Sequence, residues 1–534
     1  MNMKDRKSAA AVLFLMLLTL WSACSRDPDH GSGEASTESG EADMPAVVAY
    51  LVCKPSAMDG QGSAILSPSD PIPVGSIGTF EVTFTVGEAG IVPKGFVIFQ
   101  VSPYWGWSSP QTWQSDAPGF TDVKTSFEDP SLEVIPLQLE RILVFSRERA
   151  MRAGETITFR YGPARVDRYA EAEELFQIFV DADGDGHHAC IKDPPMLRIL
   201  PLQAASLIVN CPSRAAPGDT VRVTAAPLDM QGNWTEFPAG ELIFHVDIDG
   251  NKAEAVRVSV EKGAKTVSFT YKLPDEGIFF FHVESRLGFQ GKSNVLFCRQ
   301  GTPSLNLYFG DIHGHTRLSD GTGTPEDFYR FAREVCGLDM AAVTDHADYG
   351  TIPLTGEVWE RLQHAANEAL DPGHFVTFVA YEWTNWTYGH RNVYFRGDSG
   401  PIYRSFEEIS DTPQKLWALL EPYETMTIAH HVGGGPIATD WSIPPGPKEW
   451  LVEICSIHGS SEVFESSKEC IYHPMEGHFV RDALNKGYRL GIIASGDTHD
   501  GHPGQRTIGC FMNGVVAVFA PELTRASVWD AFQR

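Results

Sequence analysis

A chain of 534 residues is too long for one ordinary domain and supplies enough apolar material for two or three cores. Hydrophobic residues make up 43% of the chain, with 31 Phe and 12 Trp, which excludes a disordered protein and indicates a packed globular one. The formal net charge of −27 argues against a nucleic-acid partner, because binding to a phosphate backbone needs clustered Lys and Arg.

Residues 1–24 have the layout of an export signal. Three basic residues precede the apolar run AAAVLFLMLLTLW, which is shorter than a bilayer-spanning helix. The small residues before Cys24 resemble a bacterial lipoprotein box, although Trp21 stands where that box usually has Leu. We expect lipidation at Cys24, with an ordinary cleaved signal as the alternative, and a membrane-anchored protein that faces the periplasm or the cell surface. The acidic, Gly- and Ser-rich residues 25–45 are predicted to be a flexible linker.

The region after the linker has the pattern of β-strands. Every second residue from Phe80 to Val86 is apolar, which is the period of a half-buried strand. Segments 255–260 and 266–271 alternate in the same way and are separated by a Glu-Lys-Gly turn. We predict a β-rich domain over residues 46–205 and an immunoglobulin-like β-sandwich over residues 206–300.

One acidic segment of the β-rich region matches the first half of a calcium loop. The sequence DADGDG places Asp181, Asp183 and Asp185 at alternate positions before a glycine. Lys192 stands where the bidentate Glu of such a loop should fall. Calcium at these three aspartates is therefore one prediction, and an ordinary acidic turn is the alternative.

The cysteines predict no zinc site. None of the nine has CxxC spacing, and an exported protein can form disulfides whose connectivity a sequence does not reveal. Cys211 and Cys298 bracket one segment and are the single pair that we favour.

The last part of the chain alternates strands and helices. Leu305 to Ile312 is apolar and predicts a strand, and Thr324 followed by Pro325 predicts the start of a helix. Gly337 ends this helix, and Leu338 to Val343 predicts the next strand. Such strand–helix units lead to parallel neighbours, and the pattern recurs to the end of the chain.

Histidines and carboxylates stand at the ends of the predicted strands in this part. In GDIHGHTRLSDG, His313 and His315 end the first strand and share one face at spacing i, i+2. Other strands end in His346, Glu382, His430 with His431, and Asp497 with His499. Two further candidates are Asp320 in the loop after the first strand and His390 just before the strand NVYF. Parallel-barrel enzymes build their sites from the carboxyl ends of several strands, and imidazole and carboxylate bind Zn, Mn or Fe. Five strand ends of this composition predict a metal site, although a single HxH would not.

Residues 307–500 resemble the polymerase-and-histidinol-phosphatase (PHP) superfamily. The motifs that carry the resemblance are HGHTRLSDG, TDH, YE followed by GHRNVYF, AHH, and GDTH. YFGDIHGHT, GHRNVYF and HGSSE are similar to the branch labelled as a domain of unknown function, DUF3604. The resemblance implies a distorted (β/α)7 barrel over residues 301–534. Members usually continue past the position of the last residue, so we expect a chain that is truncated at its C-terminus.

The resemblance also implies a cluster of two or three divalent ions. One ion would have the ligands His313, His315, Glu382 and Asp497; a second would share Glu382 and add His390 and His430; a third would have Asp320, His346 and His499. His431 occupies a place where the family often has Pro, so the choice between His430 and His431 stays open, with His430 favoured.

The expected function is a metal-dependent hydrolase, a phosphoesterase that uses hydroxide bound to the metal cluster. We expect His458 to protonate the leaving oxygen, and His502 and Arg506 to meet an anionic substrate. The expected partner is a small phosphorylated molecule, with no nucleic acid and with membrane contact through the lipid anchor alone. One alternative is hydrolysis of an amide, lactone or carbonyl ester, because a fold does not fix its chemistry. Another is a non-catalytic surface lipoprotein that binds glycan or protein.

Overall fold

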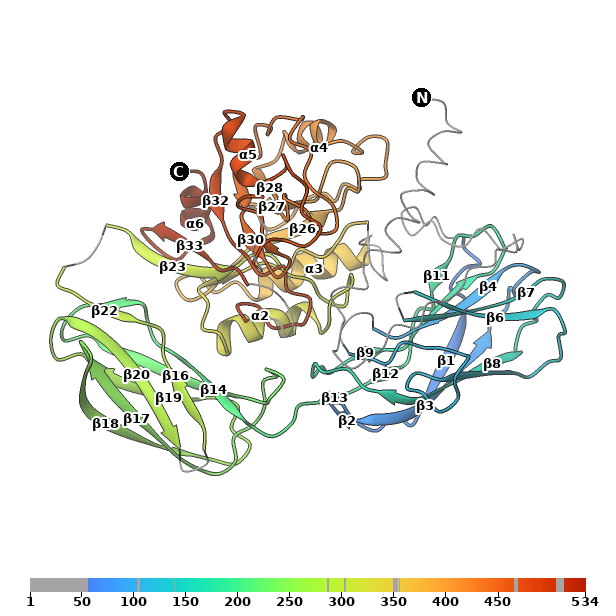
Figure 1. The fold of residues 1–534 in the computed structure, drawn as a ribbon, viewed down its shortest axis with the longest axis horizontal. Helices are drawn as coiled ribbons and strands as arrows, with labels where there is room; N and C mark the ends of the chain where they lie inside the picture. The colour runs from blue at the N-terminus through green and yellow to red at the C-terminus, as the bar shows by residue number, and fades with distance from the viewer. Residues whose placement is uncertain are drawn as a thin grey trace. The chain divides into compact units, whose positions relative to one another are not determined.

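The computed structural model describes residues 56–102, 106–138, 140–285, 288–301, 304–348, 354, 356–464, 469–505 and 513–534 (Figure 1). The predicted signal, Cys24, the linker and Arg506 lie outside these residues. In the described part of the chain strands predominate, with five helices, α2 to α6. None of these helices is long and apolar enough to cross a membrane.

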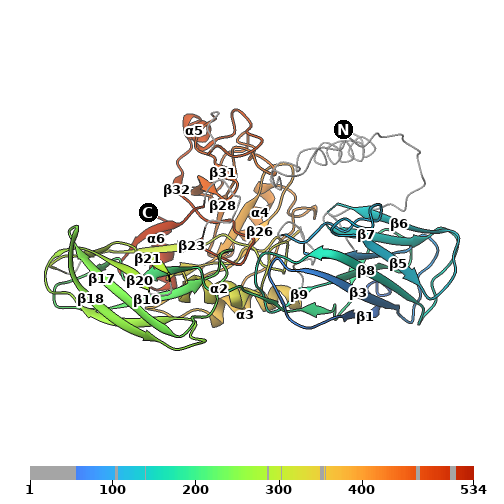
Figure 2. The ribbon, with the colours of Figure 1, turned by 60° about the horizontal axis from the view of Figure 1, so that its bottom comes forward.

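The first part of the fold has two antiparallel sheets, which lie in the blue and cyan region of Figure 2. One sheet has the order β1 (Gly62–Ser67), β3 (Ile77–Val86), β8 (Thr156–Arg165) and β5 (Thr121–Thr125). The other has the order β11 (Ala189–Cys190), β10 (Gln177–Asp181), β4 (Phe96–Gln100), β7 (Arg141–Ser146) and β6 (Leu132–Leu137). Two short strand pairs complete this first part of the fold: β2 (Ile72–Pro73) with β13 (Ile199–Leu200), and β9 (Glu174–Leu175) with β12 (Met196–Leu197).

The side chains of β3 explain how these sheets pack. Phe80, Val82, Phe84 and Val86 are all buried, as the alternation predicts. They belong to one core with residues of the opposite sheet, and the ring of Phe99 stacks on that of Phe159 at 5.1 Å between centroids. Strand β4 is buried on both faces because Phe96 and Ile98 belong to a second apolar cluster on the other side.

The second part is a two-layer β-sandwich with its own core. The smaller sheet has the order β14 (Ser206–Asn210), β16 (Thr220–Leu228) and β19 (Val267–Lys272). The larger one has the order β15 (Arg214–Ala215), β22 (Leu296–Cys298), β20 (Gly277–Ser285), β17 (Gly240–Ile248) and β18 (Asn251–Val260), and β21 (Gln290–Lys292) also pairs with β20.

The turn predicted at Glu-Lys-Gly connects β18 to β19, and these strands pair in different sheets. The turn therefore carries the chain from one layer to the other. The disulfide favoured between Cys211 and Cys298 is wrong, because both residues are free thiols. Burial raises the pKa of the Cys211 thiol to about 11. The domain boundaries at residues 205 and 300 stay a prediction.

The third part carries the five helices and two larger sheets. One sheet has the order β25 (Val376–Thr377), β24 (Met340–Ala341), β23 (Asn306–Asp311) and β33 (Val516–Ala520). The other has the order β26 (Val379–Trp383), β27 (Arg391–Phe395), β28 (Thr425–Ala429), β29 (Leu451–Glu453) and β32 (Gly491–Ile493). The remaining elements are β30 (Cys455–Ser456), β31 (Gly459–Ser460), α2 (Pro325–Glu334), α3 (Glu357–Glu368), α4 (Pro413–Leu420), α5 (Val480–Asn485) and α6 (Arg525–Phe532).

The predicted start of α2 is confirmed, since the Thr324 hydroxyl oxygen accepts the Asp327 backbone N–H at 3.1 Å. The seven strand–helix units of the distorted (β/α)7 barrel expected from the sequence, however, are not evident in the described residues, which have five helices. In addition, β27 runs antiparallel to both β26 and β28. The short connection 384–390 accounts for the antiparallel pairing of β26 with β27, since parallel neighbours need a crossover of a dozen or more residues. The described chain is therefore multidomain and strand-rich, and this third part follows two β-rich parts in sequence.

Candidate metal centre

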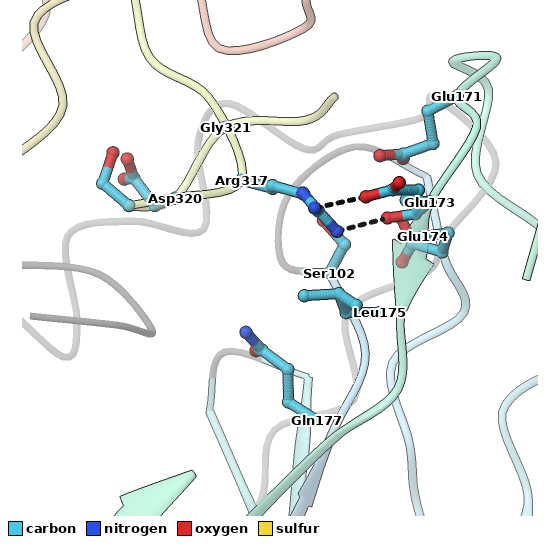
Figure 3. A pocket seen from close by; sticks show the side chains of 10 residues that line it. Ser102, Glu171, Glu173, Glu174, Leu175, Gln177, Arg317, Asp320 and Gly321 are labelled. Carbon is cyan, nitrogen blue, oxygen red and sulfur yellow. Dashed lines mark hydrogen bonds and ion pairs between the residues drawn. The ribbon is translucent and has the colours of Figure 1, made fainter. Parts of the chain in front are cut away.

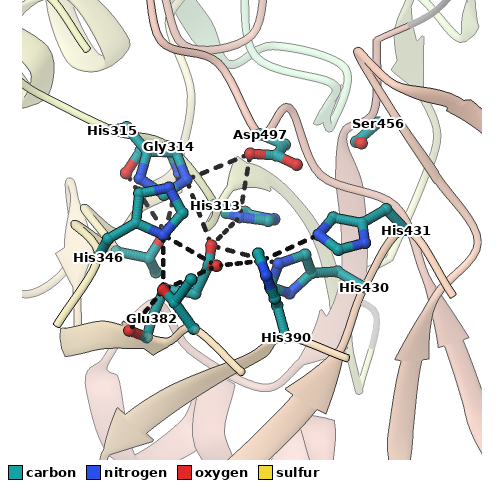
Figure 4. A network of polar contacts seen from close by, with 12 residues as sticks. His313, Gly314, His315, His346, Glu382, His390, His430, His431, Ser456 and Asp497 are labelled. Atoms are coloured by element: carbon teal, nitrogen blue, oxygen red, sulfur yellow. Dashed lines mark hydrogen bonds and ion pairs between the residues drawn. The ribbon is translucent and has the colours of Figure 1, made fainter. Parts of the chain in front are cut away.

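The predicted ligands converge at the ends of the two sheets of the third part, where their rings and carboxylates point toward one another (Figure 4). Two isolated parallel bridges, Gly314 with Thr498 and His346 with Glu382, bring these strand ends together. Glu382 is 1% exposed and Asp497 is 2% exposed, so both carboxylates are removed from water. Burial of so many polar groups costs free energy unless they bind one another or a ligand.

The first group contains two histidines that face the same two carboxylates. Nε2 of His315 lies 3.2 Å from Oδ1 of Asp497 and 3.4 Å from Oε2 of Glu382. Nε2 of His313 lies 3.3 Å from that Asp497 oxygen and 3.4 Å from that Glu382 oxygen. The structure thus brings together all four residues predicted for one ion.

The second group surrounds the other side of Glu382. Nδ1 of His390 lies 2.7 Å from Oε1 of Glu382, and Nε2 of His430 lies 3.2 Å from Oε2. His431 belongs to the same group, because its Nε2 lies 3.2 Å from Nδ1 of His390. Its Nδ1 donates to the Ile437 carbonyl at 3.1 Å, the contact that normally orients a ligating imidazole. Both neighbours, His430 and His431, therefore have ligand atoms in this group.

The third group contains Asp320, His346 and His499, as predicted, together with His315. Oδ1 of Asp320 lies 3.5 Å from Nε2 of His346 and 3.4 Å from Nε2 of His499. The ring of His315 stacks against both imidazoles, at 4.3 Å and 4.2 Å between centroids. Nδ1 of His499 donates to the Asp497 carbonyl at 2.8 Å, which leaves its Nε2 directed at Asp320.

Residues outside the predicted set fix the orientation of the ligand rings. Nδ1 of His313 donates to Oε2 of Glu453 at 2.9 Å. Glu453 ends β29, so the strand-end pattern that singled out the other residues could also have found it. Asp345 accepts the Thr316 N–H at 2.7 Å and the Ser319 hydroxyl at 2.6 Å, and so ties down the loop after His315.

The electrostatics of the cluster favour ionised carboxylates. Burial alone would raise the pKa of Asp497, but the charges of His313 and His458 hold that pKa well below its ordinary value. Burial acts in the same direction on Glu382, and the charges of His346 and His430 hold its pKa well below its ordinary value. These ionised groups attract positive charge into a site from which water is largely removed.

The donor set fits divalent metal ions. The ligand atoms within each group lie within 4.8 Å of one another, and the groups consist of buried imidazoles and carboxylates. Nδ1 of His430 and Nε2 of His390 make no hydrogen bond with any described residue. Nitrogen and carboxylate donors of this kind suit Zn, Mn or Fe.

The additional catalytic candidates are placed differently. Nε2 of His458 lies 3.1 Å from Oδ2 of Asp497, and its side chain is 18% exposed, so it stands at the edge of the cluster. His502 instead packs against Phe331 at 4.7 Å and Tyr169 at 5.2 Å between ring centroids. It lines a separate cavity of about 270 Å³, and the structure does not bring it to the predicted ligands.

The acidic segment predicted as a calcium loop forms hydrogen bonds with its own backbone. Oδ1 of Asp181 accepts the Gly184 N–H at 2.7 Å, and Oδ2 accepts the Gly186 N–H at 3.0 Å. Asp185 accepts the N–H of His187 at 2.8 Å. These contacts are compatible with an acidic turn, and calcium at Asp181, Asp183 and Asp185 stays a prediction.

Comparisons with known proteins give partial matches. The family described as a protein of unknown function (DUF3604) matches residues 341–434, whereas curated proteins give no match. The chain is similar to a solved two-domain protein from Bacteroides vulgatus ATCC 8482 that contains a predicted PHP-like metal-dependent phosphoesterase. That match has 18% identity and a TM-score of 0.31, and it covers 44% of this chain and 64% of the other, less than two thirds. A superoxide reductase (neelaredoxin) from Ignicoccus hospitalis is 16% identical with a TM-score of 0.15, over 18% of this chain and 82% of that one.

Proposed function

We propose that the third part of the chain is a metal-dependent hydrolase that binds two or three divalent cations at the strand ends. The observation that supports this function is the set of buried imidazoles and carboxylates whose ligand atoms lie within 4.8 Å of one another in each group. A structural zinc ion needs about four ligands. The larger donor set around the shared Glu382 therefore favours a cluster of ions over a single structural one.

The contacts support an assignment of the ligands to three sets. The sets are His313, His315, Glu382 and Asp497; Glu382, His390, His430 and His431; and Asp320, His346 and His499. Oε2 of Glu382 faces His313, His315 and His430. Oε1 faces His390 and His346, so Glu382 would be a bridging ligand. Glu453 holds the ring of His313 through Nδ1 and fixes which nitrogen faces the ions.

Phosphoester hydrolysis is the reaction that this arrangement supports best. Bound divalent cations would lower the pKa of a water molecule and neutralise the charge that develops on phosphoryl oxygens. His458, at the partly exposed edge, would donate a proton from Nε2 to the leaving oxygen. Asp497 beside it would hold this imidazole in position.

We also propose that the barrel expected from the sequence is present in distorted form. The bridges Gly314–Thr498 and His346–Glu382 connect the two sheets at the site. Through these connections the strands β23, β24, β26, β27, β28, β29 and β32 would follow one another around the ligands.

We propose, from the sequence alone, that the protein is exported and anchored through a lipid on Cys24. Labelled palmitate should be incorporated into the wild-type protein in a bacterial host and not into Cys24→Ala. Equal labelling of both proteins would contradict this anchor.

The function is tested by elemental analysis of the purified protein, followed by a screen of phosphomonoesters, phosphodiesters, lactones and amides beside Asp497→Asn. We expect about two or three equivalents of Zn, Mn or Fe per chain and hydrolysis of a phosphoester that the variant loses. Hydrolysis of a lactone or an amide but of no phosphoester would favour the alternative hydrolase, which acts on amides, lactones or carbonyl esters. A metal-free protein that remains active, or a variant as active as wild type, would overturn the proposal.

A further inference from the structure

The loop that carries Asp320 contacts a segment of the β-rich part that lies far away in sequence (Figure 3). The Gly323 backbone N–H donates to Oε2 of Glu171 at 2.9 Å. Nη1 of Arg317 donates to the backbone carbonyl of Glu173 at 3.2 Å, and Nη2 forms an ion pair with the Glu173 carboxylate. Arg317, which precedes Asp320, and Gly323, which follows it, are thus held by residues 171–173.

Little space remains between the two segments. They enclose a cavity of about 20 Å³, lined by Glu171, Glu173, Arg317 and Asp320 among others. A cavity of this size holds about one water molecule. The Arg317 side chain is 13% exposed, so without the Glu173 carboxylate its guanidinium would be largely buried with only a backbone carbonyl of residue 173 in place of its ion pair.

The segment that holds the loop is itself rigidly fixed. Glu171 exchanges backbone hydrogen bonds with Ile199, at 3.1 Å and 2.9 Å. Strand β9 pairs with β12, and Oε1 of Glu174 accepts the indole N–H of Trp107 at 2.9 Å. Trp107 belongs to the core between the two sheets of the first part. The contacts to the Asp320 loop therefore come from a packed scaffold.

The remaining contacts of the loop lie at positions where it meets the metal centre. Thr316 and Ser319 donate to Asp345, and the Thr322 N–H donates to the His499 carbonyl at 2.7 Å. The Arg317 N–H donates to the Gly323 carbonyl at 3.0 Å and closes the loop, and the β-rich segment holds both of these residues. The position of Asp320, whose Oδ1 faces both His346 and His499, is set by the two kinds of contact together.

We propose that Glu171 and Glu173 are positioning residues of the metal centre, and that the β-rich part completes the third ligand set through the Asp320 loop. This inference rests on the proposed function, because it presumes that Asp320, His346 and His499 bind an ion. The two glutamates act through Gly323 and Arg317 and do not ligate the ion. Residues that orient a metal ligand commonly change metal affinity by about 10- to 100-fold when they are removed.

The test uses the full chain, stripped of metal and titrated with Mn²⁺ or Zn²⁺ by calorimetry. In Glu171→Ala we expect the Kd of the weakest-bound ion to rise about 10-fold, with the other ions unaffected. In Glu171→Gln the amide oxygen still accepts the Gly323 N–H, so the Kd should stay within about 3-fold of wild type. Glu241→Ala, which removes an exposed ion pair with Arg257, is the matched control and should leave every Kd unchanged.

The ion pair is tested separately with Arg317→Ala, Glu173→Ala and the double variant. Each single variant should raise the Kd of the same ion about 10-fold, and the double variant should raise it no further, because the two side chains act as one pair. These variants also provide the answer if Glu171→Ala fails to fold.

Two results would overturn the inference in distinguishable ways. If wild type binds two or three ions and all the alanine variants bind them equally tightly, the positioning role is wrong while the proposed function stands. If wild type binds no ion under any condition, both proposals fail together.

Discussion

The β-sandwich of residues 206–298 and the metal centre both bury polar side chains. The two regions differ in whether the buried polar atoms have hydrogen-bond partners within the protein. In the sandwich region, Asp229 accepts the N–H groups of Gln231 and Asn233 through Oδ1 and that of Leu202 through Oδ2. In the metal centre, Nδ1 of His430 and Nε2 of His390 make no hydrogen bond with any described residue, although both residues are buried. Buried polar groups that serve the fold are normally hydrogen-bonded. Those of the metal centre could hold a metal ion.

Loss of a carboxylate from the metal centre should give the largest effect on activity. Asp497 faces two imidazoles of the first set, so Asp497→Asn should lower phosphoester hydrolysis by about 100-fold or more. The rate constant kcat and the metal content of wild type and variant provide the measurement. Unchanged kcat with unchanged metal content would show that Asp497 does not serve the metal centre, and the contrast drawn between the two regions would be wrong.

Loss of Asp229 should instead affect stability. Asp229→Ala leaves several buried N–H groups without an acceptor, and we expect the free energy of unfolding to fall by about 3 kcal/mol. Urea unfolding measures this change, and metal titration should give the same stoichiometry as wild type. A variant that loses metal and keeps its stability would contradict the structural role.

His430 and His431, which directly follow β28, test which histidines of the metal centre bind metal. His430→Ala and His431→Ala should each weaken metal binding by about 10- to 100-fold. In the metal-free protein, His431→Ala should lower the free energy of unfolding by about 1 kcal/mol, because it removes the hydrogen bond to the Ile437 carbonyl. His430→Ala should lower it by less, because Nδ1 of His430 makes no hydrogen bond with any described residue. If one variant binds metal like wild type, that histidine is not a ligand.

Substitutions of Glu453 should have a smaller effect on metal affinity, because this residue acts by orienting the His313 ring. Glu453→Gln keeps an acceptor for the His313 ring but removes the charge, so metal affinity should fall by about 10-fold or less. Glu453→Ala should cost more than Glu453→Gln in the same calorimetric titration. Equal affinities in wild type and both variants would show that His313 needs no such support.

The smallest predicted effect lies away from the metal centre and depends on pH. Burial raises the pKa of Asp339 from 3.8 to about 6, against the hydrogen bond that it accepts from the Phe309 N–H. Between these values the folded state keeps a proton that the unfolded state loses, so this contribution to stability is present below about pH 4 and is lost as the pH rises through 6. In the metal-free protein, the Asp339 carboxyl group should account for a loss of about 1–2 kcal/mol of stability over this interval. Asp339→Asn should reduce that loss, and an identical pH profile for both proteins would contradict the prediction.

The sequence predicted the ligand set because strand ends are visible in it. His313, Glu382 and Asp497 each follow or end an apolar run, and the carboxyl ends of parallel strands meet at one edge of a barrel. The contact between Glu171 and the Asp320 loop was not predictable, because it joins residues about 150 positions apart through one side chain and one backbone N–H. The antiparallel placement of β27 was missed because the strand pattern does not reveal the direction of a neighbour.

The central claim is that the strand ends of the third part bind a cluster of divalent ions. Anomalous diffraction from crystals grown with Mn²⁺ or Zn²⁺, collected on both sides of the metal absorption edge, tests it most directly. We expect two or three anomalous peaks beside Glu382, within coordination distance of the three ligand sets. Crystals that contain the metal but show no peak among these residues would contradict the account.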